Sequence, residues 1–246
     1  LSLANVADDA VSWHGFIVGG KTSESVSTIQ KQDFTTDTEI ALYGNVSTSW
    51  YLSIGYNSSL HGYNSNGSFG GTLGVSFIDR ITFSNNVGNS TVVGNLNNDK
   101  LYASGCNSSN YGFIIGGTHN NIGTSVVERH SFPNDSGNAV VVGNMSSIRI
   151  HNNSMNSSLY GFTIGMLVQG TDQSEVERIT FPFNSGIGVV SGTMSRAMRA
   201  FTTFNSSLHG FICGGYTTAA NSIIDRLVFP FNSGVSSSVG YLSSIG

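Results

Sequence analysis

Adjacent acidic and basic residues recur four times in the sequence, at Asp79-Arg80, Glu128-Arg129, Glu177-Arg178 and Asp225-Arg226. Carboxylates can act as general acid and base, as in glycoside hydrolysis, where two carboxyl groups must lie roughly 5 to 10 Å apart in one site. These pairs recur at a nearly constant interval, so a repeating structure places each pair in a separate copy of its unit. We therefore expect a structural role, with opposite charges stabilising facing strands.

Histidine is the other residue type with catalytic or metal-binding capacity. One repeat position is shared by His14, His61, Tyr111, Tyr160 and His209. All ligands of one metal ion must lie near it, at about 2.1 Å for a histidine nitrogen, whereas packed sheets hold equivalent positions on the order of 10 Å apart. We therefore predict aromatic packing at this position, and we predict no metal and no other cofactor. Nucleophile-elbow, zinc-protease and phosphate-loop motifs are absent from the sequence, which indicates a protein that is not an enzyme.

The same regularity defines the elements that must position any site. A histidine or tyrosine followed by glycine and an aromatic residue appears in all five copies, and the glycines are Gly15, Gly62, Gly112, Gly161 and Gly210. They are separated by 47, 50, 49 and 49 residues. Each unit ends on a further glycine, and in all four internal cases that glycine lies eighteen residues before the next anchor. Such spacing indicates five copies of one supersecondary unit.

Each unit contains four short β segments joined by turn residues, and no stretch shows sustained helical periodicity. This pattern predicts an all-β fold, a five-bladed β-propeller of four-stranded antiparallel blades with a repeat of about 49 residues. We expect a single domain of residues 1–246. The expected blades are residues 1–47, 48–96, 97–145, 146–194 and 195–246. The regular spacing also predicts closure of the ring after five blades, with adjacent termini.

The order of residues resembles the kelch repeat. A basic residue precedes the unit at Lys100, Arg149 and Arg199, and a hydrophobic strand ends in a double glycine, as in Gly116-Gly117. A phenylalanine and a proline turn replace the tryptophan usual after the third kelch strand, and the second and fourth units lack the double glycine. The resemblance implies that the strand before the double-glycine strand is innermost. Residues 6–13 would then form the inner strand of the first blade.

Composition restricts the partners. The chain has only 10 lysines and arginines in 246 residues and a formal net charge of −4, which disfavours nucleic acid and anionic membranes as partners. No apolar stretch approaches the length of a membrane span, so we predict no membrane insertion. A composition rich in Asn, Ser and Gly is similar in style to kelch-like repeats of bacteriophage tail fibres and other viral surface proteins. This similarity implies an extracellular or virion-surface location, and it is compatible with membership of a larger assembly.

We therefore expect a non-catalytic recognition or structural-assembly module of the virion, tail-fibre or adhesin type, with a glycan or a protein as its partner. A secreted five-bladed lectin is one alternative, and a glycan-active enzyme on a propeller scaffold is another, because fold alone does not decide function.

The loops after the second strand differ in every unit, whereas the other turns are near-copies. Loops on a rigid scaffold usually carry function, so we predict that a ligand contacts this variable face. Neutral drift of these loops is the rival explanation. The predicted ligand-binding residues are Lys21, His119, Asn120, Gln169, Asp172 and Tyr216.

Overall fold

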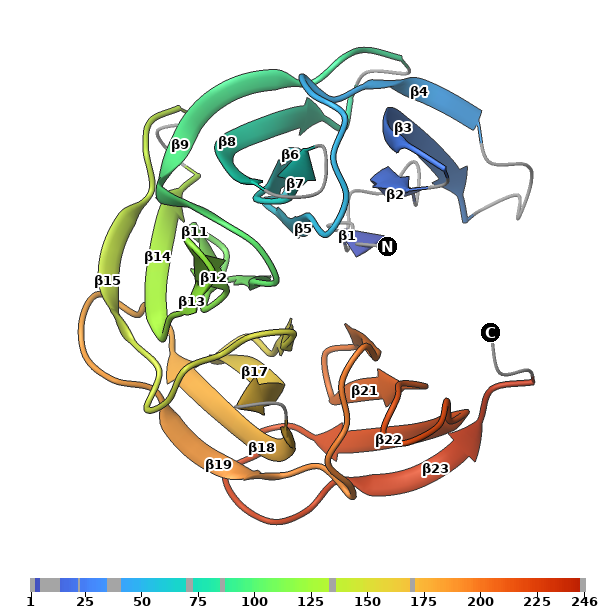
Figure 1. The fold of residues 1–246 in the computed structure, drawn as a ribbon, viewed down its shortest axis with the longest axis vertical. Helices are drawn as coiled ribbons and strands as arrows, with labels where there is room; N and C mark the ends of the chain where they lie inside the picture. The colour runs from blue at the N-terminus through green and yellow to red at the C-terminus, as the bar shows by residue number, and fades with distance from the viewer. Residues whose placement is uncertain are drawn as a thin grey trace. The chain divides into compact units, whose positions relative to one another are not determined.

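The computed structural model describes residues 3–4, 14–21, 23–34, 41–69, 73–84, 87–132, 136–168 and 171–243. All regular elements within these ranges are β-strands, and they form five larger antiparallel sheets and one two-stranded hairpin (Figure 1). The prediction of an all-β, five-bladed β-propeller with four-stranded antiparallel blades is therefore confirmed. In the described part of the chain, no helix is long and apolar enough to cross a membrane.

The strands of each sheet pair in chain order. The first sheet contains β1 (Leu3–Ala4), β2 (His14–Lys21), β3 (Ser25–Asp33) and β4 (Ala41–Asn45). The second contains β5 (Ile54–Asn57), β6 (His61–Ser65), β8 (Leu73–Thr82) and β9 (Thr91–Lys100), and the short β7 (Ser68–Phe69) also pairs with β8. The third contains β10 (Ser104–Asn107), β11 (Tyr111–Ile115), β14 (Val126–Ser131) and β15 (Val140–Asn144).

The two remaining sheets follow the same order. The fourth contains β16 (Asn153–Asn156), β17 (Tyr160–Val168), β18 (Thr171–Thr180) and β19 (Val189–Thr193). The fifth contains β20 (Thr202–Asn205), β21 (His209–Cys213), β22 (Ile223–Val228) and β23 (Ser237–Tyr241). A separate two-stranded hairpin, β12 (Thr118–His119) and β13 (Ile122–Gly123), follows β11.

The chain divides into two compact units. The first comprises residues 1–101, 109–113 and 128–140, and the second comprises residues 102–108, 114–127 and 141–246. Ring closure and the inner strand predicted at residues 6–13 both depend on residues outside the described ranges. On the side of β2 away from β3, the paired strand is β1, in the register Leu3 to Ile17 and Ala4 to Phe16.

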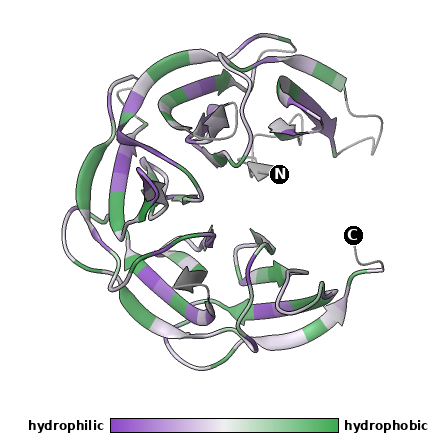
Figure 2. Cartoon of the chain, in the orientation of Figure 1, coloured by the Kyte–Doolittle hydropathy of each residue, from purple (hydrophilic) through white to green (hydrophobic). Residues whose placement is uncertain are grey.

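Each unit has a hydrophobic core in which the side chains of successive sheets pack together. In the first unit, Phe16, Ile29, Tyr43, Trp50 and Ile81 belong to one buried cluster. In the second, the sheets after β15 contribute a larger cluster that includes Phe162, Ile164, Met198, Phe201 and Leu227. Hydrophilic residues interrupt the hydrophobic ones along β18, as Figure 2 shows, and Val176, Glu177 and Ile179 of this strand are all buried.

The repeated Asn-Ser-Ser motif forms the turn between the first and second strands. The Ser206 hydroxyl accepts hydrogen bonds from the backbone N–H groups of Leu208 at 3.3 Å and His209 at 3.1 Å. Ser58 and Ser157 make the same bonds in the second and fourth sheets. The motif therefore recurs because its hydroxyl closes this turn in each of these sheets.

The closing glycines recur because the next sheet lies directly against them. A Cβ atom on Gly94 would overlap the carbonyl oxygen of Gly137, which lies in the following sheet, in the connection between its third and fourth strands. The same relation holds between Gly192 and Gly234. Thr193 N–H donates to Gly234 O at 2.9 Å, and Ser236 N–H donates to Thr193 O at 2.9 Å, so backbone hydrogen bonds join the fourth and fifth sheets at this point.

Candidate functional site

The four recurring carboxylates are fully buried within the third strand of their sheets: Asp79, Glu128, Glu177 and Asp225. Each accepts hydrogen bonds from the lead-in segment, the residues between one sheet's closing glycine and the next sheet's first strand. Ser47 Oγ donates to Asp79 Oδ2 at 2.8 Å, and the Ser195 backbone N–H donates to Asp225 Oδ2 at 3.2 Å. The structural role that we expected is observed, but these partners come from the lead-in segment and not, as we expected, from opposite charges on facing strands.

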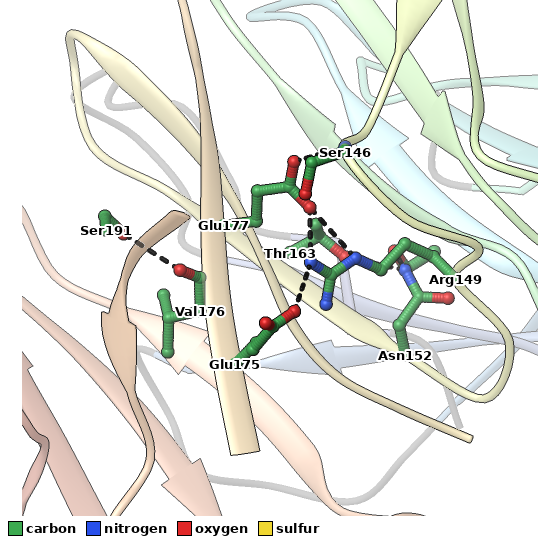
Figure 3. Close-up of polar contacts among 9 residues, drawn as sticks. Ser146, Arg149, Asn152, Thr163, Glu175, Val176, Glu177 and Ser191 are labelled. Atoms are coloured by element: carbon green, nitrogen blue, oxygen red, sulfur yellow. Dashed lines mark hydrogen bonds and ion pairs between the residues drawn. The ribbon is translucent and has the colours of Figure 1, made fainter. Parts of the chain in front are cut away.

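Two of these carboxylates also have a buried cation as partner. Lys100 Nζ lies 3.0 Å from Glu128 Oε1, and Arg149 Nε donates to Glu177 Oε2 at 3.1 Å (Figure 3). Arg149 Nη2 also bonds to Glu177 and reaches Glu175 Oε2 at 3.3 Å. These carboxylates are occupied by donors of the fold, so their arrangement suits interblade stabilisation and not acid-base catalysis.

The aspartates have a serine where the glutamates have a cation. Ser90 Oγ donates to Asp79 Oδ1 at 2.6 Å, and Ser236 Oγ donates to Asp225 Oδ2 at 2.8 Å. At the positions equivalent to Lys100 and Arg149, these two sheets carry the buried apolar residues Trp50 and Met198. At both aspartates a serine hydroxyl therefore donates to the shorter carboxylate, and no buried cation occupies the equivalent position.

A different group of polar residues gathers in the second unit, where the lead-in segment of the fifth sheet meets the loops after two second strands. Asp172 lies near the tip of the β17–β18 hairpin, and Tyr216 follows β21. Arg199 lies between them: its Nη1 donates to Asp172 Oδ1 at 2.8 Å, and its guanidinium carbon lies 5.1 Å from the Tyr216 ring centroid. The Arg199 and Tyr216 backbones also exchange hydrogen bonds of 3.0 and 2.8 Å. The hydrogen bond to Asp172 and the contact with the Tyr216 ring therefore hold the Arg199 guanidinium in place.

The next two lead-in segments toward the N-terminus extend this group. The rings of Tyr102 and His151 have their centroids 3.9 Å apart, and His151 N–H donates to Tyr102 O at 3.2 Å. Burial lowers the pKa of His151 below its ordinary value of 6.5, and the positive charge of Arg199 lowers it further, whereas Asp172 raises it. The pKa of His151 thus depends on the charges of Asp172 and Arg199. We call Tyr102, His151, Asp172, Arg199 and Tyr216 the Arg199 cluster.

Two residues of this cluster occupy an unusual backbone position. Eight residues after the closing glycine, φ is positive in four lead-in segments: 61° at Leu52, 57° at Tyr102, 54° at His151 and 55° at Ala200. Residues other than Gly, Asn and Asp adopt this conformation at a cost of about 1 kcal/mol or more. The conformation recurs in four lead-in segments with four different residue types, so it belongs to the repeat, and in two of these segments it carries a polar aromatic side chain, Tyr102 or His151.

The predicted site residues fall in several places. Asp172 and Tyr216 meet around Arg199, as described. In the first unit, the Lys21 ammonium lies 4.7 Å from the Tyr51 ring centroid. His119 and Asn120 belong to the β12–β13 hairpin, where Asn120 Nδ2 and His119 Nε2 are 3.0 Å apart. Gln169 lies outside the described residues.

Sequence reasoning missed three members of the cluster as ligand-binding candidates. Arg199 was interpreted as the basic residue that precedes a kelch-like unit. His151 has no histidine or cysteine at metal-ligand spacing, and Tyr102 does not occupy the repeat position that carries histidine or tyrosine, so neither residue stood out. One signal in the sequence could have found Tyr102 and His151. Both stand eight residues after a closing glycine, at a position where the repeat itself does not conserve residue type.

The protein has no match among family models or curated proteins. No family match therefore supports the kelch-like resemblance of its repeat. Within the described residues, no group of three or more His, Cys, Asp or Glu side chains could hold a metal ion. Arginine, tyrosine and histidine of the Arg199 cluster can instead donate hydrogen bonds, stack on flat groups and attract an anion.

Proposed function

We propose that the protein is a non-catalytic recognition or structural-assembly module that binds a glycan or a protein partner through the loops after its second strands. The observation that carries this proposal is the convergence of Asp172, Arg199 and Tyr216, which come from two such loops and a lead-in segment. The Tyr216 side chain is 41% exposed, so a tyrosine ring in contact with a guanidinium is accessible to a ligand. Exposed aromatic rings beside fixed polar groups are a common basis of recognition.

The buried carboxylates support the non-catalytic part of this proposal. Asp79, Glu128, Glu177 and Asp225 are fully buried, and each accepts bonds from the lead-in segment. A general acid or base must reach its substrate within hydrogen-bond distance, and these groups have no exposed surface with which to do so. Their repetition in four sheets is fully explained by the fold.

The composition and the repeat favour a location outside the cell or on a virion. Asn, Ser and Gly dominate the turns, and lysine occurs only at Lys21, Lys31 and Lys100. A kelch-like propeller of the tail-fibre or adhesin type combines these features, with a rigid scaffold that presents variable loops. In this proposal, the near-identical Asn-Ser-Ser turns maintain the fold and the variable loops select the partner.

Exchange of loops tests the proposal. In one variant, every connection after a second strand is replaced by residues 118–125, which form a tight hairpin; in the matched control, the Asn-Ser-Ser turns are exchanged among themselves. Binding of the labelled protein is measured on intact cells and on a printed glycan array. We expect the first variant to lose at least tenfold in binding and the control to retain it. Undiminished binding by a folded loop variant would refute the proposal, and so would turnover of a glycan substrate.

A further inference from the structure

We infer that the Arg199 cluster binds an acidic sugar, a glycan unit that bears a carboxylate, with Arg199 as the anchor of the acid group. This inference rests on the proposed function and specifies its ligand. It depends on three properties of the described residues: the orientation of the Arg199 guanidinium, the aromatic rings beside it, and the scarcity of other cations at these loops.

Arg199 is held but not saturated. A guanidinium has five N–H donors in a planar fork. The structure uses one nitrogen, Nη1, for Asp172 and places the guanidinium 5.1 Å from the Tyr216 ring centroid. The Arg199 side chain retains 34% of its exposure, whereas the Asp172 side chain retains 13%. The Asp172 carboxylate is thus mostly buried, and it orients the guanidinium. The Arg199 side chain, which carries the remaining N–H donors, is partly exposed to solvent. A carboxylate matches such a fork with two parallel hydrogen bonds.

The surroundings suit a sugar ring. Tyr216 is exposed and fixed by its backbone bonds to Arg199, and Tyr102 and His151 form a second aromatic pair. The lowered pKa keeps His151 neutral at pH 7, so its ring can offer both a hydrogen-bond donor and an acceptor to hydroxyl groups. Tyrosine hydroxyls offer the same combination. A carboxylate, hydroxyl groups and a C–H face that can pack on an aromatic ring occur together in an acidic monosaccharide.

The four other arginines of the second unit lie elsewhere. Arg149 is fully buried against Glu177, Arg178 lies over the Tyr160 ring, Arg196 bonds to its neighbour Ser195, and Arg226 lies within strand β22 and not in a loop. The second unit contains no lysine. Arg199 is therefore the cation that the described loops of this unit present beside exposed tyrosine. We also predict that binding depends only weakly on the salt concentration, because the complex contains a single ion pair, between Arg199 and the carboxylate of the sugar.

The experiment uses an array on which each carboxylate-bearing glycan is printed beside its carboxyl-reduced neutral form, followed by calorimetry with the best pair. The variants are Arg199→Gln, Arg199→Lys and the matched control Arg196→Gln, which removes one arginine charge from the same lead-in segment. Thermal unfolding of each variant verifies that it is folded. We expect the parent and Arg196→Gln to prefer the carboxylated form at least tenfold. We expect Arg199→Gln to abolish this preference, and Arg199→Lys to keep part of it because the charge remains without the planar fork.

Equal binding of acidic and reduced glycans by the parent would overturn the inference and leave the proposed function intact. The same holds if the preference for acid survives Arg199→Gln in a folded variant. Absence of any glycan binding would also overturn the inference. The proposed function itself would then be decided by the loop-exchange experiment on intact cells, where a protein partner gives a signal that the glycan array does not.

Discussion

Lys100 Nζ lies 3.0 Å from Glu128 Oε1, and the two side chains are 2% and 0% exposed. The same carboxylate accepts a bond from the Asn97 backbone N–H at 2.7 Å. A buried ion pair adds little net stability compared with apolar residues of equal size, but the loss of one partner leaves an uncompensated buried charge. The pair is therefore a sensitive point of the first unit.

Replacement of this lysine provides the first prediction. Lys100→Met should lower the free energy of unfolding by about 3–5 kcal/mol, because Glu128 loses its counter-ion inside the protein. The double variant Lys100→Met with Glu128→Gln should recover most of that loss. Urea unfolding of both variants measures the difference, with Lys31→Met as the lysine control outside the buried pair. A cost below about 1 kcal/mol for Lys100→Met would contradict a buried ionic contact.

A second prediction transfers the aspartate arrangement into the fourth sheet. Gly188 occupies the position that Ser236 has in the fifth sheet, and a Cβ atom there would lie 2.8 Å from Glu177 Oε1 and 2.6 Å from Met145 Cε. Gly188→Ser alone should therefore cost about 1–3 kcal/mol by overpacking. Arg149→Met alone should cost about 3–5 kcal/mol by leaving Glu177 without its cation.

The triple variant Glu177→Asp, Gly188→Ser and Arg149→Met reproduces the set Asp225, Ser236 and Met198. Its free energy of unfolding should fall by less than that of Arg149→Met alone. The shorter carboxylate accepts a hydrogen bond from the new serine hydroxyl and therefore does not need the buried cation that has been removed. Chemical denaturation of the three proteins tests this order. A triple variant less stable than both single variants would show that the two arrangements are not interchangeable.

The fold was predictable from the sequence because every sheet repeats the same physical constraints. Positions 94 and 192 require glycine because the turn of the next sheet lies against them, and the Ser206 hydroxyl closes its own turn. The repeated sequence motifs therefore reflect local structural requirements. The partner of each carboxylate was not predictable in this way. Lys100 and Glu128 lie 28 positions apart, and only the packing of one sheet on the next brings them together.

The candidate site was predictable in part. Asp172 and Tyr216 stand out because their loops differ from the corresponding loops of other units. Arg199 resembles a repeat residue, yet the structure shows that Met198 takes the buried position equivalent to Arg149 and leaves Arg199 at the loops. A shift of one residue within a lead-in segment thus moves a cation from the interior to the site. The spacing shows this shift, because Arg199 follows its closing glycine by seven residues, whereas Lys100 and Arg149 follow theirs by six.

A third prediction concerns the titration of His151. Its pKa lies below 6.5 because of burial and then because of Arg199, with Asp172 acting in the opposite direction. Arg199→Gln should therefore raise the pKa of His151, Asp172→Asn should lower it further, and Arg196→Gln should leave it unchanged. Proton NMR of the imidazole signals measures all three. A His151 pKa that is insensitive to Arg199→Gln would contradict the electrostatic link within the Arg199 cluster.

The same shift affects stability. The folded state binds the His151 proton less tightly than the unfolded chain, where histidine titrates near pH 6.5. Protonation therefore favours unfolding, and the stability that depends on neutral His151 is lost as the pH falls through about 6.5 toward the folded pKa. His151→Gln should lose less stability than the parent between pH 7 and pH 5 in denaturant titrations. An equal loss in both proteins would assign the pH dependence to other groups.

The last prediction uses the free thiol of Cys106. Cys106 is 2% exposed, and a Cβ atom on Gly161 would lie 2.6 Å from its Sγ, so the thiol is enclosed by the neighbouring sheet of the second unit. Burial raises the pKa of Cys106 to about 12. Only about one thiol in ten thousand would then be ionised at pH 8, and the thiolate is the form that reacts.

In a Cys213→Ala background, we expect an aromatic disulfide reagent to modify Cys106 at least a thousandfold more slowly than an exposed thiol introduced by Ser207→Cys. Addition of denaturant should bring the two rates together, because unfolding removes both the burial and the raised pKa. Comparable rates in the native protein would show that the sheets around Cys106 open far more readily than their packing indicates.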